Sequence, residues 1–155
     1  MIRTRVLPVV LLFVALTPLV GCSTGEKREL LTEIDAYYSD LSDCDWDAFR
    51  DHFWPGATIT TTWSEDPNDP PSVQTVTVDE FIEHANEGPG SQPIFEEHRT
   101  GSFIILEKDL AQVWATYDAK FGTEDNLNEW SGIDAFTLLR HNDRWRITGI
   151  AFQPE

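Results

Sequence analysis

Apolar residues recur at helical spacing early in the chain and at alternate positions through most of the remainder. Positions 30, 31, 34, 37, 38 and 41 place one apolar stripe on a helix predicted over residues 26–41. Asp45 can cap a second short helix, which Pro55-Gly56 ends. The capping-box pattern Thr77-Val-Asp-Glu80 starts a third. The pattern thus predicts three helices, two of them before any strand.

Strand-like alternation covers five segments, residues 57–63, 94–106, 110–121, 130–140 and 144–152. Short polar turns at 107–109 and 141–143 join the last four as two hairpins. Both arms of the final hairpin are too apolar to stand free, so we expect it at the centre of a curved antiparallel sheet. The segment Ser64–Ser72 is rich in prolines, which lack a donor for a sheet ladder, and is predicted to be a mobile loop.

Helices grouped apart from strands indicate an α+β domain in which helices cover one face of the sheet. Polar residues 122–129 are expected to link the two hairpins. The length suits one domain with a single core. No internal repeat or low-complexity tract suggests a second unit.

The first residues have the pattern of an export signal. Arg3 and Arg5 precede an apolar run over residues 6–16, and Leu19-Val-Gly-Cys22 comes next, which resembles the bacterial lipobox. Residues 1–21 are therefore expected to be a lipoprotein signal peptide, with Cys22 lipidated, 22–28 a tether and 29–155 the domain. This predicts export across the inner membrane and a lipid-anchored location, periplasmic or at the cell surface. The alternative is an ordinary signal peptide with a chance cysteine.

The charge of the chain restricts its partners. Lysine and arginine number 11 against 27 acidic residues, a formal net charge of −16 at pH 7. This argues against nucleic acid and against an anionic bilayer as a docking surface. A cationic partner, or simply solubility, is compatible with it.

Several segments resemble one known group of folds. Gly132-Ile-Asp-Ala-Phe-Thr-Leu-Leu-Arg140 with Arg144-Trp-Arg-Ile-Thr-Gly-Ile-Ala151 is similar to the nuclear transport factor 2-like superfamily, closest to its lumazine-binding branch. Cys44-Asp-Trp-Asp-Ala-Phe49 and Asp109-Leu-Ala-Gln-Val-Trp114 support the likeness. The resemblance implies a cone-shaped curved sheet, antiparallel or mixed, with three N-terminal helices covering its concave face. It also implies a pocket inside the cone and a possible homodimer through the outer sheet face.

The superfamily includes SnoaL-like cyclases and ketosteroid isomerases. Aligning the chain on the isomerases tests whether their catalytic residues are present here. Tyr37 falls at their oxyanion-hole tyrosine, Thr61 at their general base and Thr137 at their acidic hydrogen-bond donor. A threonine hydroxyl is neither a base near neutral pH nor a strong acid, which argues against the isomerase reaction. Asp134 is expected to face outward or lie at a subunit contact.

By alternation, the side chains of 98, 100 and 102 should share a face, as should those of 114, 116 and 118. If that face lines the pocket, His98 and Asp118 are its titratable groups and, with Tyr37, the candidate catalytic residues of an enzyme. His98 as a hydrogen-bonded structural residue is the alternative. The expected ligand-binding residues are Tyr37, Phe53, Thr61, Trp63, His98, Trp114, Thr116, Asp118 and Thr137.

The tryptophans suit a pocket for a flat ligand, so the expected function is binding of a small hydrophobic or aromatic molecule without established catalysis. The alternatives are a SnoaL-like or isomerase-type enzyme acting on a carbonyl substrate, and a non-catalytic scaffold that dimerises or binds a protein through its sheet. No phosphate-binding glycine loop, nucleophile elbow or cysteine-pair metal motif occurs, so no cofactor or metal is expected. His52, His84 and His141 lack metal-ligand spacing and are expected at the surface.

Overall fold

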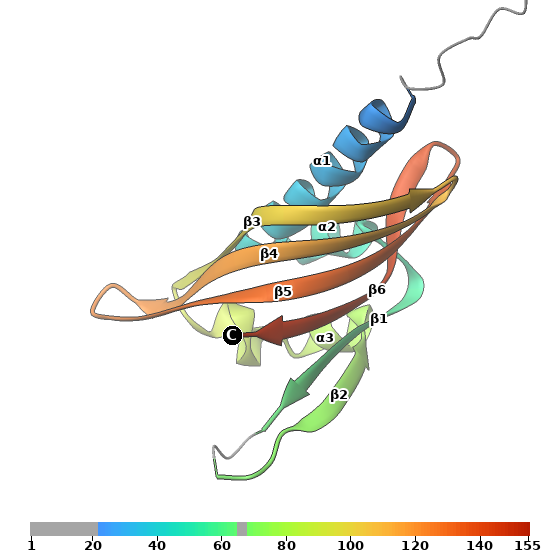
Figure 1. Ribbon diagram of the computed structural model, residues 1–155. Coiled ribbons are helices and arrows are strands. Elements are labelled where there is room, and N and C mark those ends of the chain that lie inside the picture. The colour runs from blue at the N-terminus through green and yellow to red at the C-terminus, as the bar shows by residue number, and fades with distance from the viewer. Residues whose placement is uncertain (1–21, 65–67) are drawn as a thin grey trace, which may run out of the picture.

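A single curled sheet of six strands carries three α-helices on one of its faces (Figure 1). The computed structural model describes residues 22–64 and 68–155. The elements are α1 (Cys22–Ser42), α2 (Trp46–Asp51), β1 (Phe53–Trp63), β2 (Ser72–Thr77), α3 (Val78–Glu83), the short 3-10 helices η1 (Ala85–Glu87) and η2 (Pro89–Ser91), β3 (Ile94–Glu107), β4 (Leu110–Thr123), β5 (Asn126–His141) and β6 (Arg144–Pro154). The α+β class is confirmed. The expected signal peptide, residues 1–21, lies outside the described residues.

The strands lie in the order β2-β1-β6-β5-β4-β3, and every neighbouring pair is antiparallel except β1 and β6. The final hairpin therefore lies inside the sheet, as its apolar arms predict. Asn142 and Asp143, at its turn, have φ values of 51° and 59°. Two consecutive left-handed residues form the tight reversal that matches the twist of a hairpin.

The helix starts predicted from capping residues are confirmed. Thr77 accepts from the backbone N–H of Glu80 at 3.2 Å, and the Glu80 carboxylate accepts from the N–H of Thr77 at 2.8 Å, so the capping box starts α3. Asp45 accepts from the N–H of Ala48 at 3.1 Å and starts α2. These side chains satisfy amide groups that a helix leaves unpaired at its first turn.

The pattern correctly places two helices before the first strand. The three N-terminal helices implied by the resemblance are wrong, because α3 comes after β1 and β2. The strand β2 is not predicted by the pattern because nearly all of it is exposed at the sheet edge, which removes the apolar alternation that marks a strand. The expected polar link at 122–129 instead belongs mostly to the ends of β4 and β5, which leave only Glu124 and Asp125 between them.

The inner face of the sheet is defined by the odd positions of β4. Residues 111, 113, 115, 117 and 119 are buried, whereas 112, 114, 116 and 118 are exposed. The buried face of α1, including Leu30, Ile34 and Tyr38, contributes to the same core. In β3 an extra residue at Thr100 shifts the pairing, because Arg99 faces Tyr117 while Gly101 faces Thr116. This bulge reverses which positions of β3 face inward.

Residues 22–28, expected to be a tether, form the first turns of α1. The Arg140 guanidinium of β5 contacts the Glu26 carboxylate at 3.2 Å and the Asp109 carboxylate at 2.9 Å. No helix of the described chain is long and apolar enough to cross a membrane.

Candidate functional site

His98 and Asp118 line a hollow of about 320 Å³ on the outer face of the sheet and no pocket on its inner face. These two residues oppose each other between β3 and β4. Trp114, Thr116 and Asp118 are nevertheless exposed on the outer face of the sheet, away from the helices. Side chains alternate between the two faces of a strand. In β4 the odd-numbered residues pack beneath α1, so the expected pocket residues, which are even-numbered, lie on the opposite face.

The other expected ligand-binding residues do not gather in one inner pocket, although Thr61 and Trp114 line a shared hollow of about 340 Å³ on the outer face. Thr137 lies between buried Phe136 and Leu138 and therefore belongs to the outer face, while the Thr61 hydroxyl donates to the Phe152 carbonyl at 3.0 Å. Phe53 is a buried core residue. Trp63 ends β1, and its side chain lies outside the described part of the chain. Tyr37 alone among those described lines the inner cavity.

That cavity, of about 310 Å³, lies between the helices and the inner face of the sheet. Its walls are almost entirely aromatic or aliphatic, with two carboxyl groups among them. The lining residues are Tyr37, Leu41, Ile59, Phe81, Gly88, Pro89, Phe95, Glu97, Tyr117, Phe121, Trp130, Asp134 and Phe152.

Asp134 projects into the interior, which corrects the expectation that it faces outward. It is 4% exposed, and Tyr38 Oη donates a hydrogen bond of 2.5 Å to its Oδ2. Burial raises the pKa of Asp134 to about 7, although the bond from Tyr38 acts against this rise. Burial, then the neighbouring Asp134 charge, holds the pKa of Tyr38 far above its usual range, so this phenol stays a donor.

Glu97 is the second carboxyl group of the cavity. Ser42, at the end of α1, fixes its backbone: the Glu97 N–H donates to Ser42 Oγ at 2.8 Å, and the same hydroxyl donates to the Glu97 carbonyl at 3.1 Å. Burial and repulsion from Asp134 raise the pKa of Glu97 to about 8. Within residues 22–64 and 68–155 no side chain is hydrogen-bonded to this carboxyl. A pair of acids therefore shares the cavity, and at neutral pH at least one is protonated.

Tyr117 lies across Gly132 of the neighbouring strand. The two residues are directly paired, and a β-carbon on Gly132 would lie 2.4 Å from Tyr117 Cζ. Burial raises the pKa of Tyr117. Because only glycine leaves room for the phenol ring here, Gly132 sets the position of one cavity wall.

We predict that Gly132→Ala displaces the Tyr117 ring and lowers the free energy of unfolding by about 1–3 kcal/mol, as overpacking in a core does. Urea unfolding measures the loss. The control is Gly149→Ala in β6, where an added β-carbon would lie 3.6 Å from the Thr58 carbonyl oxygen, an ordinary contact. Equal stability of the two variants would contradict the predicted crowding.

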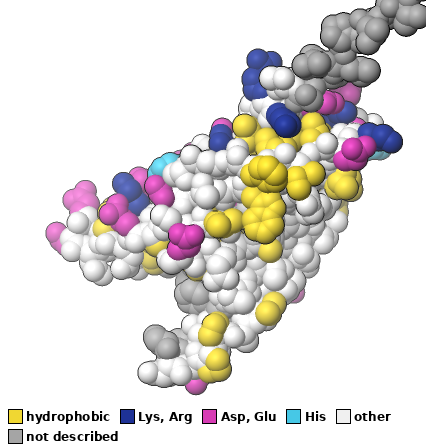
Figure 2. Space-filling model, viewed as in Figure 1, with side chains coloured by type: hydrophobic (Ala, Val, Ile, Leu, Met, Phe, Trp, Pro, Cys, Tyr) yellow, Lys and Arg dark blue, Asp and Glu magenta, His cyan; other side chains and the backbone are white. Residues whose placement is uncertain are grey.

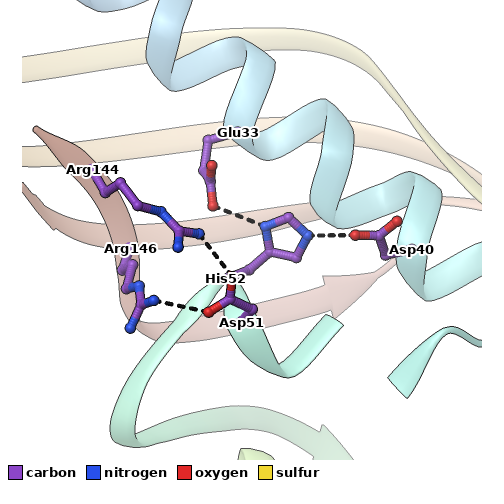
Figure 3. Close-up of polar contacts among 6 residues, drawn as sticks. All are labelled: Glu33, Asp40, Asp51, His52, Arg144 and Arg146. Carbon is purple, nitrogen blue, oxygen red and sulfur yellow. Dashed lines mark hydrogen bonds and ion pairs between the residues drawn. The ribbon is translucent and has the colours of Figure 1, made fainter. Parts of the chain in front are cut away.

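A second polar cluster, built around buried His52, joins α1 to the end of α2 (Figure 3). His52 Nδ1 lies 2.8 Å from Glu33 Oε1, and its Nε2 lies 2.8 Å from Asp40 Oδ2. The adjacent Asp51 carboxylate accepts from Arg144 at 3.0 Å and from Arg146 at 2.8 Å. His52 is 8% exposed, so its expected surface position is wrong. Its ring also contacts Tyr37 edge-on, which connects this cluster to the cavity wall.

Burial opposes a charge on His52, but hydrogen bonds with Glu33 and Asp40 outweigh it and raise the pKa of the imidazole above 6.5. The contribution of charged His52 to the stability of the fold is therefore complete below about pH 6.5 and is lost as pH rises through the folded-state pKa of His52. We predict that His52→Gln costs about 1–3 kcal/mol of unfolding free energy at low pH and less at high pH. Urea unfolding across pH tests this, with exposed His141→Gln as control. A cost independent of pH would refute it.

The sequence contained part of the signal for the cavity acids. Asp134 alternates with Gly132, Phe136 and Leu138, all of which are buried, so its position is the polar interruption of a buried run. Glu97 carried no such signal, because Glu96-Glu97 suggests a solvated pair. Across the described residues, no group of three or more His, Cys, Asp or Glu side chains is arranged to hold a metal ion.

Comparison with known proteins gives fold-level likeness only. No protein-family model and no curated protein matches the chain. A Mycobacterium tuberculosis protein of unknown function is 13% identical with a TM-score of 0.70, covering 89% of this chain and 78% of that one. A candidate scytalone dehydratase from Novosphingobium aromaticivorans is 14% identical with a TM-score of 0.69, covering 86% of each chain.

A candidate dehydratase from Streptomyces avermitilis, described as nuclear transport factor 2-like, is 12% identical with a TM-score of 0.68 and covers 86% of this chain and 98% of its own. A nuclear transport factor 2-like protein of unknown function from Silicibacter pomeroyi has a TM-score of 0.62 at 14% identity, covering 86% of this chain and 98% of its own. Identities this low carry no argument about activity. The TM-scores show that this chain has the nuclear transport factor 2-like fold.

Proposed function

We propose that this chain is a lipid-anchored, extracytoplasmic domain that binds one small, largely apolar molecule in its inner cavity. The observation that carries the proposal is an aromatic hollow of about 310 Å³ with two carboxyl groups in its wall, buried Asp134 and half-buried Glu97. Ligand sites are characteristically apolar cavities of about 300–1,000 Å³ with a few polar groups that orient the ligand. The resemblance of the final hairpin to the lumazine-binding branch supports a flat aromatic ligand.

Binding is tested by native mass spectrometry of the purified domain and by titration with small aromatic compounds. Trp130→Ala removes a cavity wall and is expected to weaken binding about tenfold or more, as loss of an aromatic anchor does. Trp114→Ala is the matched control, because Trp114 is 51% exposed on the outer face. If Trp114→Ala weakens binding and Trp130→Ala does not, the ligand is not in the inner cavity.

The lipid anchor rests on the Leu19-Val-Gly-Cys22 segment, since the signal peptide lies outside the described residues. Intact-mass analysis of membrane-extracted protein is expected to find a diacylglyceryl group on Cys22. Cys22→Ser is expected to leave the precursor unprocessed. A mature N-terminus at another residue would exclude lipidation at Cys22, and with it this anchor.

Acid–base catalysis on a carbonyl substrate is the second candidate function, favoured by the inward-facing Asp134 and Glu97. Two of the similar folds are candidate dehydratases. A carboxylate and a carboxylic acid in one apolar cavity can abstract and return a proton, a role that the threonines at positions 61 and 137 cannot fill. Asp134→Asn is then expected to abolish turnover with folding retained, while exposed His98→Ala leaves it unchanged. Turnover that survives Asp134→Asn would reject this role.

A homodimer through the outer sheet face remains a proposal. Phe103 and Trp114 are opposed between β3 and β4 and are 65% and 51% exposed. Figure 2 shows hydrophobic side chains gathered on this face of the molecule. Sedimentation equilibrium is expected to find a dimer that Trp114→Asp dissociates. A monomer at all concentrations would exclude it.

A further inference from the structure

The inner cavity holds two acids and no base. Among its lining residues, all within the described chain, none is lysine, arginine or histidine. Arg99 of β3 is held by the Asp35 carboxylate through two contacts of 2.8 Å. His52 is occupied by Glu33 and Asp40. No cation of the described chain is therefore placed to neutralise Glu97 and Asp134.

The other groups around the two carboxyls are phenols or apolar side chains. Tyr37 and Tyr38 face them from α1, and Tyr117 faces them from β4. The wall formed by α3, η2, β1 and β6 contributes Phe81, Gly88, Pro89, Ile59 and Phe152, none of which titrates. Only Asp134 receives a hydrogen bond, from Tyr38, whereas the carboxyl of Glu97 has no bonded partner within the described chain. The Glu97 carboxyl group at the cavity wall is therefore left for a ligand to contact.

Aromatic rings form most of the remaining surface. Phe95 and Phe121 pack edge-on at 6.3 Å between ring centroids, and Tyr117 and Trp130 lie on the adjacent strands β4 and β5. The faces of such rings attract cations, and the attraction strengthens where water is excluded. Aromatic faces beside two carboxyl groups that no cation of the described chain neutralises form a site for positive charge attached to an apolar body.

We propose that the ligand of the inner cavity is an organic cation, a hydrophobic amine or quaternary ammonium compound whose charge lies by Glu97 and Asp134 and whose apolar part packs on the aromatic wall. This inference rests on the proposed binding function and names its ligand class. The net charge of −16 also favours approach of a cation through long-range attraction.

Proton linkage separates this ligand class from a neutral one. In the empty cavity, burial raises the pKa of both carboxyl groups, so each holds its proton to a higher pH than an exposed carboxyl does. A cation favours their ionised forms, so its binding releases protons and strengthens as pH rises. A neutral carbonyl compound instead accepts a hydrogen bond from a protonated carboxyl, so its binding strengthens as pH falls.

The test is calorimetric titration with benzyltrimethylammonium, whose charge does not change with pH, and with its uncharged isostere neopentylbenzene. We expect the cation to bind more tightly than the isostere. Its affinity should rise up to about tenfold per pH unit between about pH 6 and pH 8, the limit for release of one proton. Comparing buffers of different ionisation enthalpy counts the protons released.

Glu97→Gln and Asp134→Asn keep the shape of each side chain and remove its charge. Each is expected to weaken cation binding about tenfold and to reduce the pH dependence, with little effect on the isostere. Glu96→Gln is the matched control, because Glu96 is the adjacent residue, exposed on the opposite face near Lys120. Near-UV circular dichroism confirms that each variant is folded.

The outcomes distinguish the two proposals. If the isostere binds in the cavity and the cation does not, the binding function stands and the cationic ligand is excluded. Cation binding that is unchanged in both carboxyl variants would place the cation elsewhere and likewise exclude it. If neither compound binds the folded protein, and native mass spectrometry finds no bound molecule, the binding function fails as well.

Discussion

The free energy of unfolding is expected to fall by on the order of 3–5 kcal/mol as pH rises from about 4.5 to about 8, because of Glu97 alone. The pKa of Glu97 is raised from 4.5 to about 8 in the folded protein. Between these values the unfolded chain has lost a proton that the folded chain retains. Folding is therefore favoured at the acidic end of this window, and the full cost of the buried charge applies above about pH 8.

Urea unfolding at several pH values measures this effect. Glu97→Gln is expected to flatten the curve and to be more stable than the wild type at pH 8 by about 2–4 kcal/mol, since it removes a buried charge without removing the side chain. Glu96→Gln should leave the curve unchanged. The raised pKa values of Asp134, about 7, and of His52 also lower the free energy of unfolding as pH rises. Part of the pH dependence therefore remains in Glu97→Gln. A curve identical to that of the wild type would contradict the burial of Glu97.

Phe136→Ala is expected to reduce the free energy of unfolding by about 3–5 kcal/mol, the cost of replacing a buried phenylalanine and leaving a void. Phe136 is 1% exposed, and its ring meets those of Tyr37 and Tyr38 at centroid distances of 5.2 and 6.1 Å. These tyrosines join α1 to the sheet. Loss of the ring should therefore loosen α1 and the cavity wall together, which thermal unfolding and near-UV circular dichroism can follow.

Phe103→Ala is the matched control for Phe136→Ala. It makes the same chemical change on the outer face, where Phe103 is 65% exposed, and should alter the stability of a monomer by less than about 0.5 kcal/mol. Dilute protein separates this effect from any association through the outer face. Similar losses in the two variants would mean that the assignment of inner and outer faces is wrong.

The local elements are largely predictable from the sequence because each depends on residues close together in the chain. Thr77 and Glu80 cap their own helix, and Asn142-Asp143 adopts the left-handed turn of its own hairpin. The apolar arms of that hairpin predict a position inside the sheet, which the order of strands confirms. Edge strand β2 is not predictable in this way because almost none of it is buried.

The candidate site depends on which face of each strand is covered, and alternation alone does not state this. In β4 the odd positions lie beneath α1, and in β5 the even positions do, so Asp134 is inside while Asp118 is outside. The bulge at Thr100 and the room above Gly132 depend on pairing between segments far apart in the chain.

The sequence by itself determined the α+β class, the caps, the two hairpin turns and the acidic charge, since these depend on neighbouring residues and composition. Only the tertiary structure decided that Glu97 and Asp134 meet in an aromatic cavity, because β3 and β5 are brought to either side of β4 and helix α1 covers one face. A shift of one residue in a strand reverses every side chain, so long-range packing selects the interior set.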